Sequence, residues 1–227
     1  MKKLNIAIIG QGRSGRQIHG EFFLSDKNKK FNVKYVVDRD DFRRTKAKET
    51  YAGCEVFKEY TELLDKEDID LVVNASYSKD HYATCKDLLA HGFNVLCEKP
   101  FCTNKKECMD LIKTAKKSGA KLCIFQQTFF GPFFTHMQEI IKNKTLGDIL
   151  QVNIRYSSFS RRWDWQTLQK MVGGNSFNTG PHPFGIAAGR VGRSSRAGDA
   201  VRRSHAQVAY ASLSARGVRG DPDELDS

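Results

Sequence analysis

Short apolar runs alternate with longer helical segments along the first 125 residues of the chain. The apolar runs are largely continuous, which is typical of strands buried on both faces of a parallel sheet. They predict strands at 4–9, 33–37, 71–73, 95–97 and 121–125. The segments between them predict helices over 13–25, 41–51, 79–90 and 104–118. This order predicts an α/β domain at residues 1–125, built on a doubly wound parallel sheet with helices on both faces.

The pattern changes after residue 126. A helix is predicted over 132–143, and residues 149–156 alternate between apolar and polar side chains. Such alternation is typical of a half-exposed strand in a different sheet. We therefore place a domain boundary near 126–132 and expect an incomplete α+β second domain at residues 126–184.

Residues 185–227 differ in composition from the rest of the chain. Lysine is the main cation up to Lys170 and does not occur after it, and the cations after Gly185 are all arginine. One interpretation is a flexible basic tail. The other, which the abrupt change favours, is a segment read in a shifted frame. Under both interpretations we expect an atypical tail, disordered or out of frame.

The formal net charge of +11 raises the question of nucleic-acid binding. Acidic residues are interleaved with the basic ones, as in Lys66-Glu67-Asp68, and no helix-turn-helix, zinc or RNA-binding motif is visible. We therefore expect a solvated surface and no nucleic-acid partner. No apolar run approaches the ~20 residues of a membrane helix, and no small-residue cleavage site follows the first apolar run. We expect no membrane partner.

Six cysteines are present. None forms a C-x-x-C pair, and no histidine stands at the spacing of a zinc finger. Without a secretory signal, free thiols in a cytoplasmic protein are the better interpretation, and no metal site is expected.

A glycine-rich loop follows the first predicted strand and opens the first predicted helix. Gly10 permits a tight turn, Gly12 lets the backbone approach a pyrophosphate, and Gly15 lets the helix pack close to the strand. The pyrophosphate would lie at the helix N-terminus, where N–H groups and the helix dipole favour an anion. A glycine turn without a ligand is the alternative. The order of strand, loop and helix favours a Rossmann-type dinucleotide-binding domain.

Asp38 ends the second predicted strand, about 20 residues after the loop, where the dinucleotide fingerprint requires an acid. Its carboxylate can accept hydrogen bonds from ribose hydroxyls, and it repels a 2′-phosphate. Arg39, Arg43 and Arg44 follow, and an arginine here can stack on adenine or pair with a 2′-phosphate. We expect NAD as the cofactor and keep NADP as the alternative.

Lys99 stands in Glu98-Lys99-Pro100, directly after the strand predicted at 95–97. The carboxyl edge of a parallel sheet is where ligands bind, so an ordinary surface lysine is the weaker interpretation. Pro100 restricts the backbone of the residue before it and so helps to aim Lys99.

Further motifs stand in the order of one enzyme family. They are Asn74-Ala75-Ser76 with His81, Gln127-Thr128-Phe129-Phe130-Gly131-Pro132, and Gly173-Gly174 followed by Asn178-Thr179-Gly180-Pro181-His182. Together with the glycine loop and Glu98-Lys99-Pro100, these motifs resemble the Gfo/Idh/MocA oxidoreductases, the family of glucose–fructose oxidoreductase and inositol dehydrogenase. The resemblance covers roughly residues 3–184.

The resemblance implies a nicotinamide cofactor and a hydroxyl-bearing small molecule, such as a sugar or an inositol, as substrate. Lys99 would stabilise alkoxide character on the reacting oxygen or relay a proton. His182 would be the second acid–base group. Asn178 stands where many members have an aspartate, and it can orient a hydroxyl but takes no proton. Glu98 would hold the lysine or the ribose. The implied cofactor-binding residues are Gly10, Gly12, Arg13, Ser14, Gly15, Asp38, Arg39, Asn74, Ser76, His81, Glu98, Lys99 and Gln127.

Three functional classes stay open. The chain is an NAD(P)-dependent dehydrogenase, a dinucleotide-binding regulator without catalysis, or an inactive truncated member of the family. Lys99 and His182 favour catalytic ancestry. In the family the second domain continues as an open sheet that covers the substrate and builds a homo-oligomer. With residues 126–184 alone we expect open strand edges and an uncovered apolar face, with partial disorder or aggregation after about residue 150 and no secure homo-oligomer.

Overall fold

The computed structural model describes residues 3–157, 161–190 and 214–215. The chain divides into two compact units. The first unit comprises Met1–Phe125 with Leu168–Val172, and the second comprises Gln126–Thr167 with Gly173–Ser227. Most of the predicted tail, from residue 191 on, lies outside the described residues except for 214–215.

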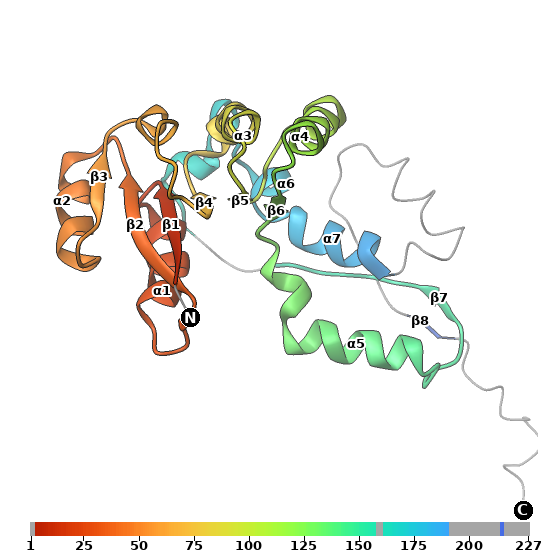
Figure 1. The fold of residues 1–227 in the computed structure, drawn as a ribbon. Coiled ribbons are helices and arrows are strands. Elements are labelled where there is room, and N and C mark those ends of the chain that lie inside the picture. Colours follow the sequence, from red (N-terminus) through yellow and green to blue (C-terminus); the bar gives the residue numbers. More distant parts are fainter. Residues whose placement is uncertain (1–2, 158–160, 191–213, 216–227) are drawn as a thin grey trace, which may run out of the picture. The chain divides into compact units, whose positions relative to one another are not determined.

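A six-stranded parallel sheet forms the centre of the first unit (Figure 1). Its strands are β1 (Leu4–Ile9), β2 (Phe31–Val37), β3 (Glu55–Phe57), β4 (Leu71–Asn74), β5 (Val95–Cys97) and β6 (Leu122–Ile124). Their order is β3-β2-β1-β4-β5-β6, so the chain winds outward from β1 in one direction and from β4 in the other. Ligands of such sheets bind at this switch point, beyond the carboxyl ends of the strands. The predicted doubly wound Rossmann-type sheet is confirmed.

Strand β3 was not predicted, because it has only three residues and one of them is a glutamate. It becomes a strand by pairing with β2, in the register Tyr35 to Glu55 through Val37 to Phe57. Pairing with β2 therefore stabilises a strand that the local sequence pattern does not predict.

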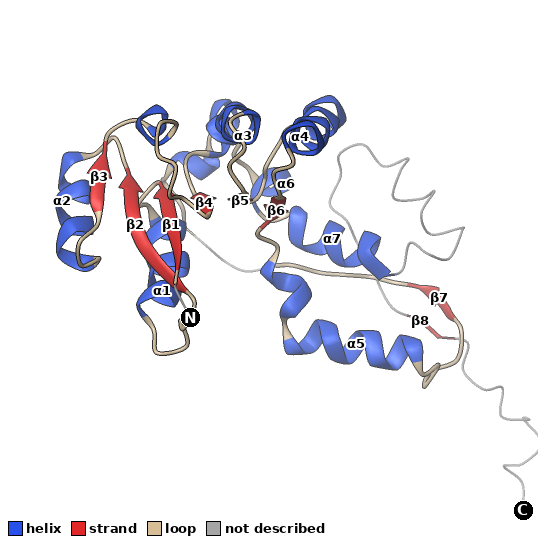
Figure 2. Ribbon diagram, viewed as in Figure 1, coloured by secondary structure: helices blue, strands red, loops and turns tan. Residues whose placement is uncertain are grey.

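Besides its strands, the first unit contains helices and short turns (Figure 2). They are η1 (Arg13–Gly20) with α1 (Glu21–Leu24), α2 (Asp41–Thr50), α3 (His81–Ala90) and α4 (Lys105–Ser118), with short turns η2 (Tyr60–Leu63), η3 (Ser78–Asp80) and η6 (Gln169–Met171). Asp40 and Asn104 cap α2 and α4 by accepting hydrogen bonds from backbone N–H groups. Gly119 ends α4 in the left-handed conformation, with φ of 76°. Figure 2 shows the helices and strands alternating as predicted, although the first helix starts with π-helical turns.

Two apolar cores lie on the two faces of the sheet. Successive residues of β1 face opposite ways, so Ala7 and Ile9 join one core, and Ile6 and Ile8 join the other. The first core includes Leu88, Leu89 and Leu111 from α3 and α4, and the second includes Ala47 and Tyr51 at the end of α2. Burial of each large side chain stabilises the fold by about 1.5–3 kcal/mol. The sheet is therefore fixed from both faces, as continuous apolar strands require.

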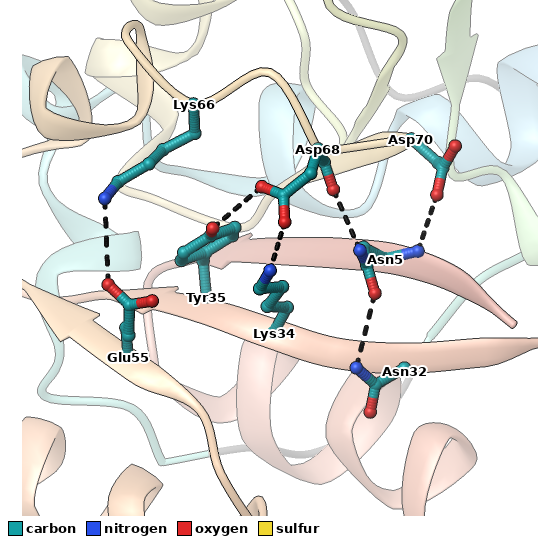
Figure 3. A network of polar contacts seen from close by, with 8 residues as sticks. All are labelled: Asn5, Asn32, Lys34, Tyr35, Glu55, Lys66, Asp68 and Asp70. Atoms are coloured by element: carbon teal, nitrogen blue, oxygen red, sulfur yellow. Dashed lines mark hydrogen bonds and ion pairs between the residues drawn. The ribbon is translucent and has the colours of Figure 1, made fainter.

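A polar network joins the amino-terminal ends of the strands, opposite the predicted site (Figure 3). The Lys34 ammonium and the Tyr35 hydroxyl, both on β2, donate to the carboxylate of Asp68. Asn5 on β1 donates through its side chain to the Asp68 carbonyl, and through its backbone N–H to Asp70 at 2.7 Å. The network ties the loop before β4 to β1 and β2.

We expect Asp68→Asn to reduce the loss in free energy of unfolding that acidification causes. The hydrogen bonds from Lys34 and Tyr35 lower the pKa of Asp68. A carboxyl with a lowered folded-state pKa stabilises the fold above its unfolded pKa, and this contribution is lost as the pH falls from about 4. Solvent screens this half-exposed group, so the effect is small.

Urea unfolding at about pH 6 and about pH 3 measures this difference. The wild type loses more free energy of unfolding on acidification than Asp68→Asn does. Asp26→Asn controls for the removal of one negative charge elsewhere. Equal losses in the wild type and Asp68→Asn would contradict the assignment.

The second unit contains mostly helical segments. They are η4 (Gln127–Phe130), α5 (Pro132–Lys142), η5 (Trp165–Thr167), α6 (Asn175–Asn178) and α7 (Pro181–Arg190). Strand β7 (Ile149–Gln151) pairs antiparallel with β8 (Ser214–Ala215). The strand predicted over 149–156 is thus shorter than expected, and α6 and α7 were not predicted. Among the described residues, no helix has the length and apolar character needed to cross a membrane.

Candidate functional site

The three glycines of the loop after β1 play different structural parts. A Cβ on Gly10, which has φ of +89°, would lie 2.4 Å from the carbonyl oxygen of Ala75. A Cβ on Gly15 would lie 1.8 Å from the Gly10 carbonyl oxygen. A Cβ on Gly12 would meet only Arg43 Nη1, at 4.0 Å. The protein's own packing thus explains Gly10 and Gly15, whereas Gly12 borders open space that a ligand can enter.

The residues of this loop fit the pyrophosphate of a dinucleotide. Gly12 is the N-cap of the helix and supplies no side-chain cap for the first N–H groups. Such a helix start stabilises an anion. Gln11 is buried, and within the described residues its Nε2 has no hydrogen-bond partner. Arg13 is exposed and Ser14 half-buried at the same helix start.

Asp38 is buried at the end of β2 and is held by the backbone. Its Oδ2 accepts a hydrogen bond from the Gln11 N–H at 2.6 Å, and its Oδ1 accepts one from the Asp40 N–H at 2.9 Å. The first bond attaches the acid directly to the glycine loop. The carboxylate therefore stands where a fingerprint acid meets the ribose of a dinucleotide.

The three arginines after Asp38 point to different partners. Arg39 pairs with Glu59 at 3.3 Å, and Arg44 Nη1 donates to the Asp38 carbonyl at 2.7 Å. Arg43 Nη1 lies 3.6 Å from Asp38 Oδ2, beside the open space at Gly12. Arg39 was the predicted cofactor residue; of these three arginines, Arg43 is the one that a Cβ on Gly12 would meet, at 4.0 Å.

Asn74, Ser76 and His81 build the turn after β4. Asn74 Oδ1 accepts a hydrogen bond from the Ser76 hydroxyl at 2.7 Å, and Asn74 Nδ2 donates to Cys85 Sγ at 3.3 Å. The buried His81 ring bridges two carbonyl oxygens, with Nδ1 2.7 Å from Pro100 and Nε2 3.1 Å from Ser76. Burial lowers the pKa of His81, whereas the contacts with the two carbonyl oxygens oppose this shift. In its neutral form the ring donates through only one nitrogen. His81 thus couples the turn after β4 to the loop after β5.

Glu98 holds a histidine that the sequence analysis did not single out. Its Oε1 lies 3.0 Å from Nε2 of His19 in the first helix, and both side chains are buried. Its Oε2 accepts from the backbone N–H of Lys99 at 3.3 Å. The ring of His19 also packs edge-on against Phe125. Glu98 therefore joins the helix of the glycine loop to the loop that carries Lys99.

His19→Ala is expected to lower the free energy of unfolding by about 3 kcal/mol, because it leaves Glu98 buried without its histidine partner. His19→Gln keeps a side-chain N–H donor and should lose less. His136→Ala, which removes an exposed histidine, serves as the control. Urea unfolding at neutral pH measures all three, and a His19→Ala loss equal to that of His136→Ala would contradict this contact.

The remaining predicted residues belong to the second unit. His182 lies in the first turn of α7, and its Nδ1 is 2.6 Å from the hydroxyl oxygen of Thr128. The Tyr156 ring stacks on the His182 ring, with centroids 6.2 Å apart. Asn178 ends α6 and is half-buried, whereas Gln127 is exposed.

The first unit thus gathers its predicted residues at one edge of the sheet. These residues are Gly10, Gly12, Arg13, Ser14, Gly15, Asp38, Asn74, Ser76, His81, Glu98 and Lys99, which follow the carboxyl ends of β1, β2, β4 and β5. Direct contacts join these loops to one another, through Gly10 with Ala75 and Gln11 with Asp38 among others. The arrangement matches that of a dinucleotide site.

Comparison with known proteins identifies the family. Residues 4–126 match the oxidoreductase family with an NAD-binding Rossmann fold, Gfo/Idh/MocA, and the chain belongs to this family. The predicted family, NAD-binding Rossmann fold and NAD cofactor class are confirmed.

Relatives support this assignment over more of the chain. An uncharacterized oxidoreductase of Schizosaccharomyces pombe is 28% identical over 185 residues, which cover 80% of this chain and 50% of the relative. The scyllo-inositol 2-dehydrogenase (NADP(+)) IolU of Bacillus subtilis is 28% identical over 134 residues, 59% of this chain and 40% of the relative. The structure of GenD2 from gentamicin A biosynthesis, in complex with NAD, superposes with a TM-score of 0.75 at 24% identity, covering 83% of this chain and 53% of GenD2. The chain spans about half the length of the curated relatives it matches.

Proposed function

We propose that this chain carries the cofactor site and the catalytic lysine of an NAD-dependent dehydrogenase, which acts on a hydroxyl group of a polyol, sugar or inositol. The observation that carries the proposal is the position of Lys99, directly after β5 at the edge where the glycine loop and Asp38 lie. The Glu98–His19 contact couples the Lys99 loop to the helix of the glycine loop. The named activity of the IolU relative supports the class of substrate.

The first unit binds and orients the dinucleotide. The N–H groups at the start of the helix, beyond Gly12, would hold the pyrophosphate. The Asp38 carboxylate would accept hydrogen bonds from the ribose hydroxyls, and its charge favours NAD over NADP. The backbone N–H of Gln11 and that of Asp40 fix this carboxylate before any ligand arrives. The carboxylate is therefore preorganised, because its side chain need not rearrange to contact the ribose.

The chemical step oxidises an alcohol to a carbonyl compound. When bound, the nicotinamide supplies the acceptor for the hydride that leaves the carbon. The Lys99 ammonium donates a hydrogen bond to the substrate oxygen and stabilises its alkoxide character. His182 takes the hydroxyl proton, and Asn178 orients a neighbouring hydroxyl without exchanging a proton. The two electrons leave with the hydride and the proton leaves through the histidine, so the reaction is balanced.

Formation of NADH from NAD⁺ tests the proposal. The purified chain is incubated with NAD⁺ and a panel of inositols, sugars and other polyols, and NADH absorbance is followed. We expect NADH to form with at least one member of the panel, and to form more slowly when NADP⁺ replaces NAD⁺. Binding of NADH without oxidation of any polyol would contradict the catalytic proposal and favour a dinucleotide-binding regulator.

A further inference from the structure

We propose that Thr128 is a positioning residue that sets the tautomer of His182, so that Nδ1 carries the proton and Nε2 accepts one from the substrate. The inference rests on the proposed acid–base function of His182 and deepens it. A neutral histidine that acts as a base at Nε2 must carry its hydrogen on Nδ1. The group that contacts Nδ1 therefore determines whether the ring can act as a base at Nε2.

The contact itself is short and lies within the second unit. Oγ1 of Thr128 is 2.6 Å from Nδ1 of His182, and Thr128 is only 8% exposed. Water therefore competes little for the Thr128 hydroxyl. A hydroxyl oxygen has two lone pairs and can accept the Nδ1–H while donating its own hydrogen elsewhere.

The backbone around both partners is fixed by further hydrogen bonds. Gln126 Nε2 donates to the carbonyl oxygen of Pro181 at 2.6 Å, directly before His182. The Gly131 N–H donates to the Thr128 carbonyl oxygen within the same turn. The turn that carries Thr128 is thus attached to the start of α7 at two points, through Gln126 and through Thr128 itself. Such double attachment holds the threonine and the histidine in register.

The Tyr156 ring stacks on the His182 imidazole, with an interplanar angle of 11°, and restricts the rotation of that ring. The base function proposed for His182 sets the direction of the Thr128 contact, because only an Nδ1–H that donates to Oγ1 leaves Nε2 able to accept a proton.

The opposite direction would have a different chemical result. If the Thr128 hydroxyl donated to Nδ1, the neutral ring would carry its hydrogen on Nε2 and could not accept a proton there. The two arrangements have the same heavy-atom positions, because they differ only in where the hydrogen atoms lie. They differ in a property that can be measured directly, the tautomer of one histidine.

Long-range ¹H–¹⁵N spectra of the full chain, labelled at histidine, distinguish protonated from unprotonated ring nitrogens. The His182 signals are those that disappear in His182→Gln. At a pH where the ring is neutral, we expect the wild type to carry its proton on Nδ1. Thr128→Ser, which keeps the hydroxyl, should preserve this tautomer, whereas Thr128→Val, which keeps the shape but removes the oxygen, should shift it toward Nε2–H.

Two results would overturn the proposal. One is a wild-type His182 that carries its hydrogen on Nε2, which needs no variant to fold. The other is a Thr128→Val spectrum with the wild-type tautomer, since another group would then set it. The measurement uses neither cofactor nor substrate, so its outcome is separate from that of the NADH-formation assay.

Discussion

Lys99→Met is expected to reduce the rate of NADH formation by at least about 100-fold while leaving the affinity for NADH within about two-fold of the wild type. A donor aimed at developing negative charge acts mainly in the transition state, so its loss lowers kcat. Methionine keeps most of the length of the lysine side chain and removes only the charge and the donors. The loop should keep its conformation, because Glu98 holds it through His19 and the Lys99 backbone N–H.

Lys121→Met is the matched control for Lys99→Met. It removes one exposed lysine just before β6, at the other edge of the sheet, and should leave the rate unchanged. Steady-state kinetics with the best polyol, together with NADH fluorescence titration, separates rate from binding. A Lys99→Met protein that turns over at the wild-type rate would remove the lysine from the mechanism. Loss of NADH binding alone would assign it to the cofactor instead.

Gly12→Val should weaken NADH binding by about 100-fold, equivalent to about 2.7 kcal/mol, without lowering the melting temperature. The backbone at Gly12 has φ of −73°, which valine tolerates, and a Cβ there meets no atom closer than Arg43 Nη1 at 4.0 Å. The protein therefore has room for a Cβ at this position. The valine side chain would, however, exclude the pyrophosphate, because the phosphates can approach the backbone closely only where residue 12 has no side chain.

Gly15→Ala provides the contrast. Its Cβ would stand 1.8 Å from the Gly10 carbonyl oxygen, so the helix must shift and the protein should lose stability as well as binding. Fluorescence titration and thermal unfolding of both variants measure the two effects. A Gly12→Val protein that binds NADH like the wild type would contradict the placement of the pyrophosphate, and a large loss of stability would show that Gly12 is needed for packing.

The fold of the first unit could be predicted because its signals are local. Continuous apolar runs such as Leu4–Ile9 identify buried strands, and the fingerprint glycines and Asp38 stand at fixed places after them. Strand β3 could not be found in this way, since it depends on pairing with β2. In the second unit, α6 and α7 follow glycine- and proline-rich sequence that has little helical periodicity.

The contacts that support the candidate site were harder to predict. Glu98 meets His19 across a separation of 79 residues, and Thr128 meets His182 across 54. Neither His19 nor Thr128 belongs to a spacing pattern that relates it to its partner. Such pairs arise from the arrangement of elements in space. A polar residue within apolar sequence indicates that its side chain has a hydrogen-bond partner, because buried polar groups are paired. It does not identify that partner.

Addition of NADH to the ¹⁵N-labelled chain, followed by ¹H–¹⁵N correlation spectra, tests the cofactor site most directly. We predict that the backbone amide signals of Gly12, Asp38 and Lys99 shift and saturate at one NADH per chain. The first two would report the pyrophosphate and the ribose, and the third would report the nicotinamide end. Spectra that do not change, or that change only outside the carboxyl edge of the first unit's sheet, would contradict the account.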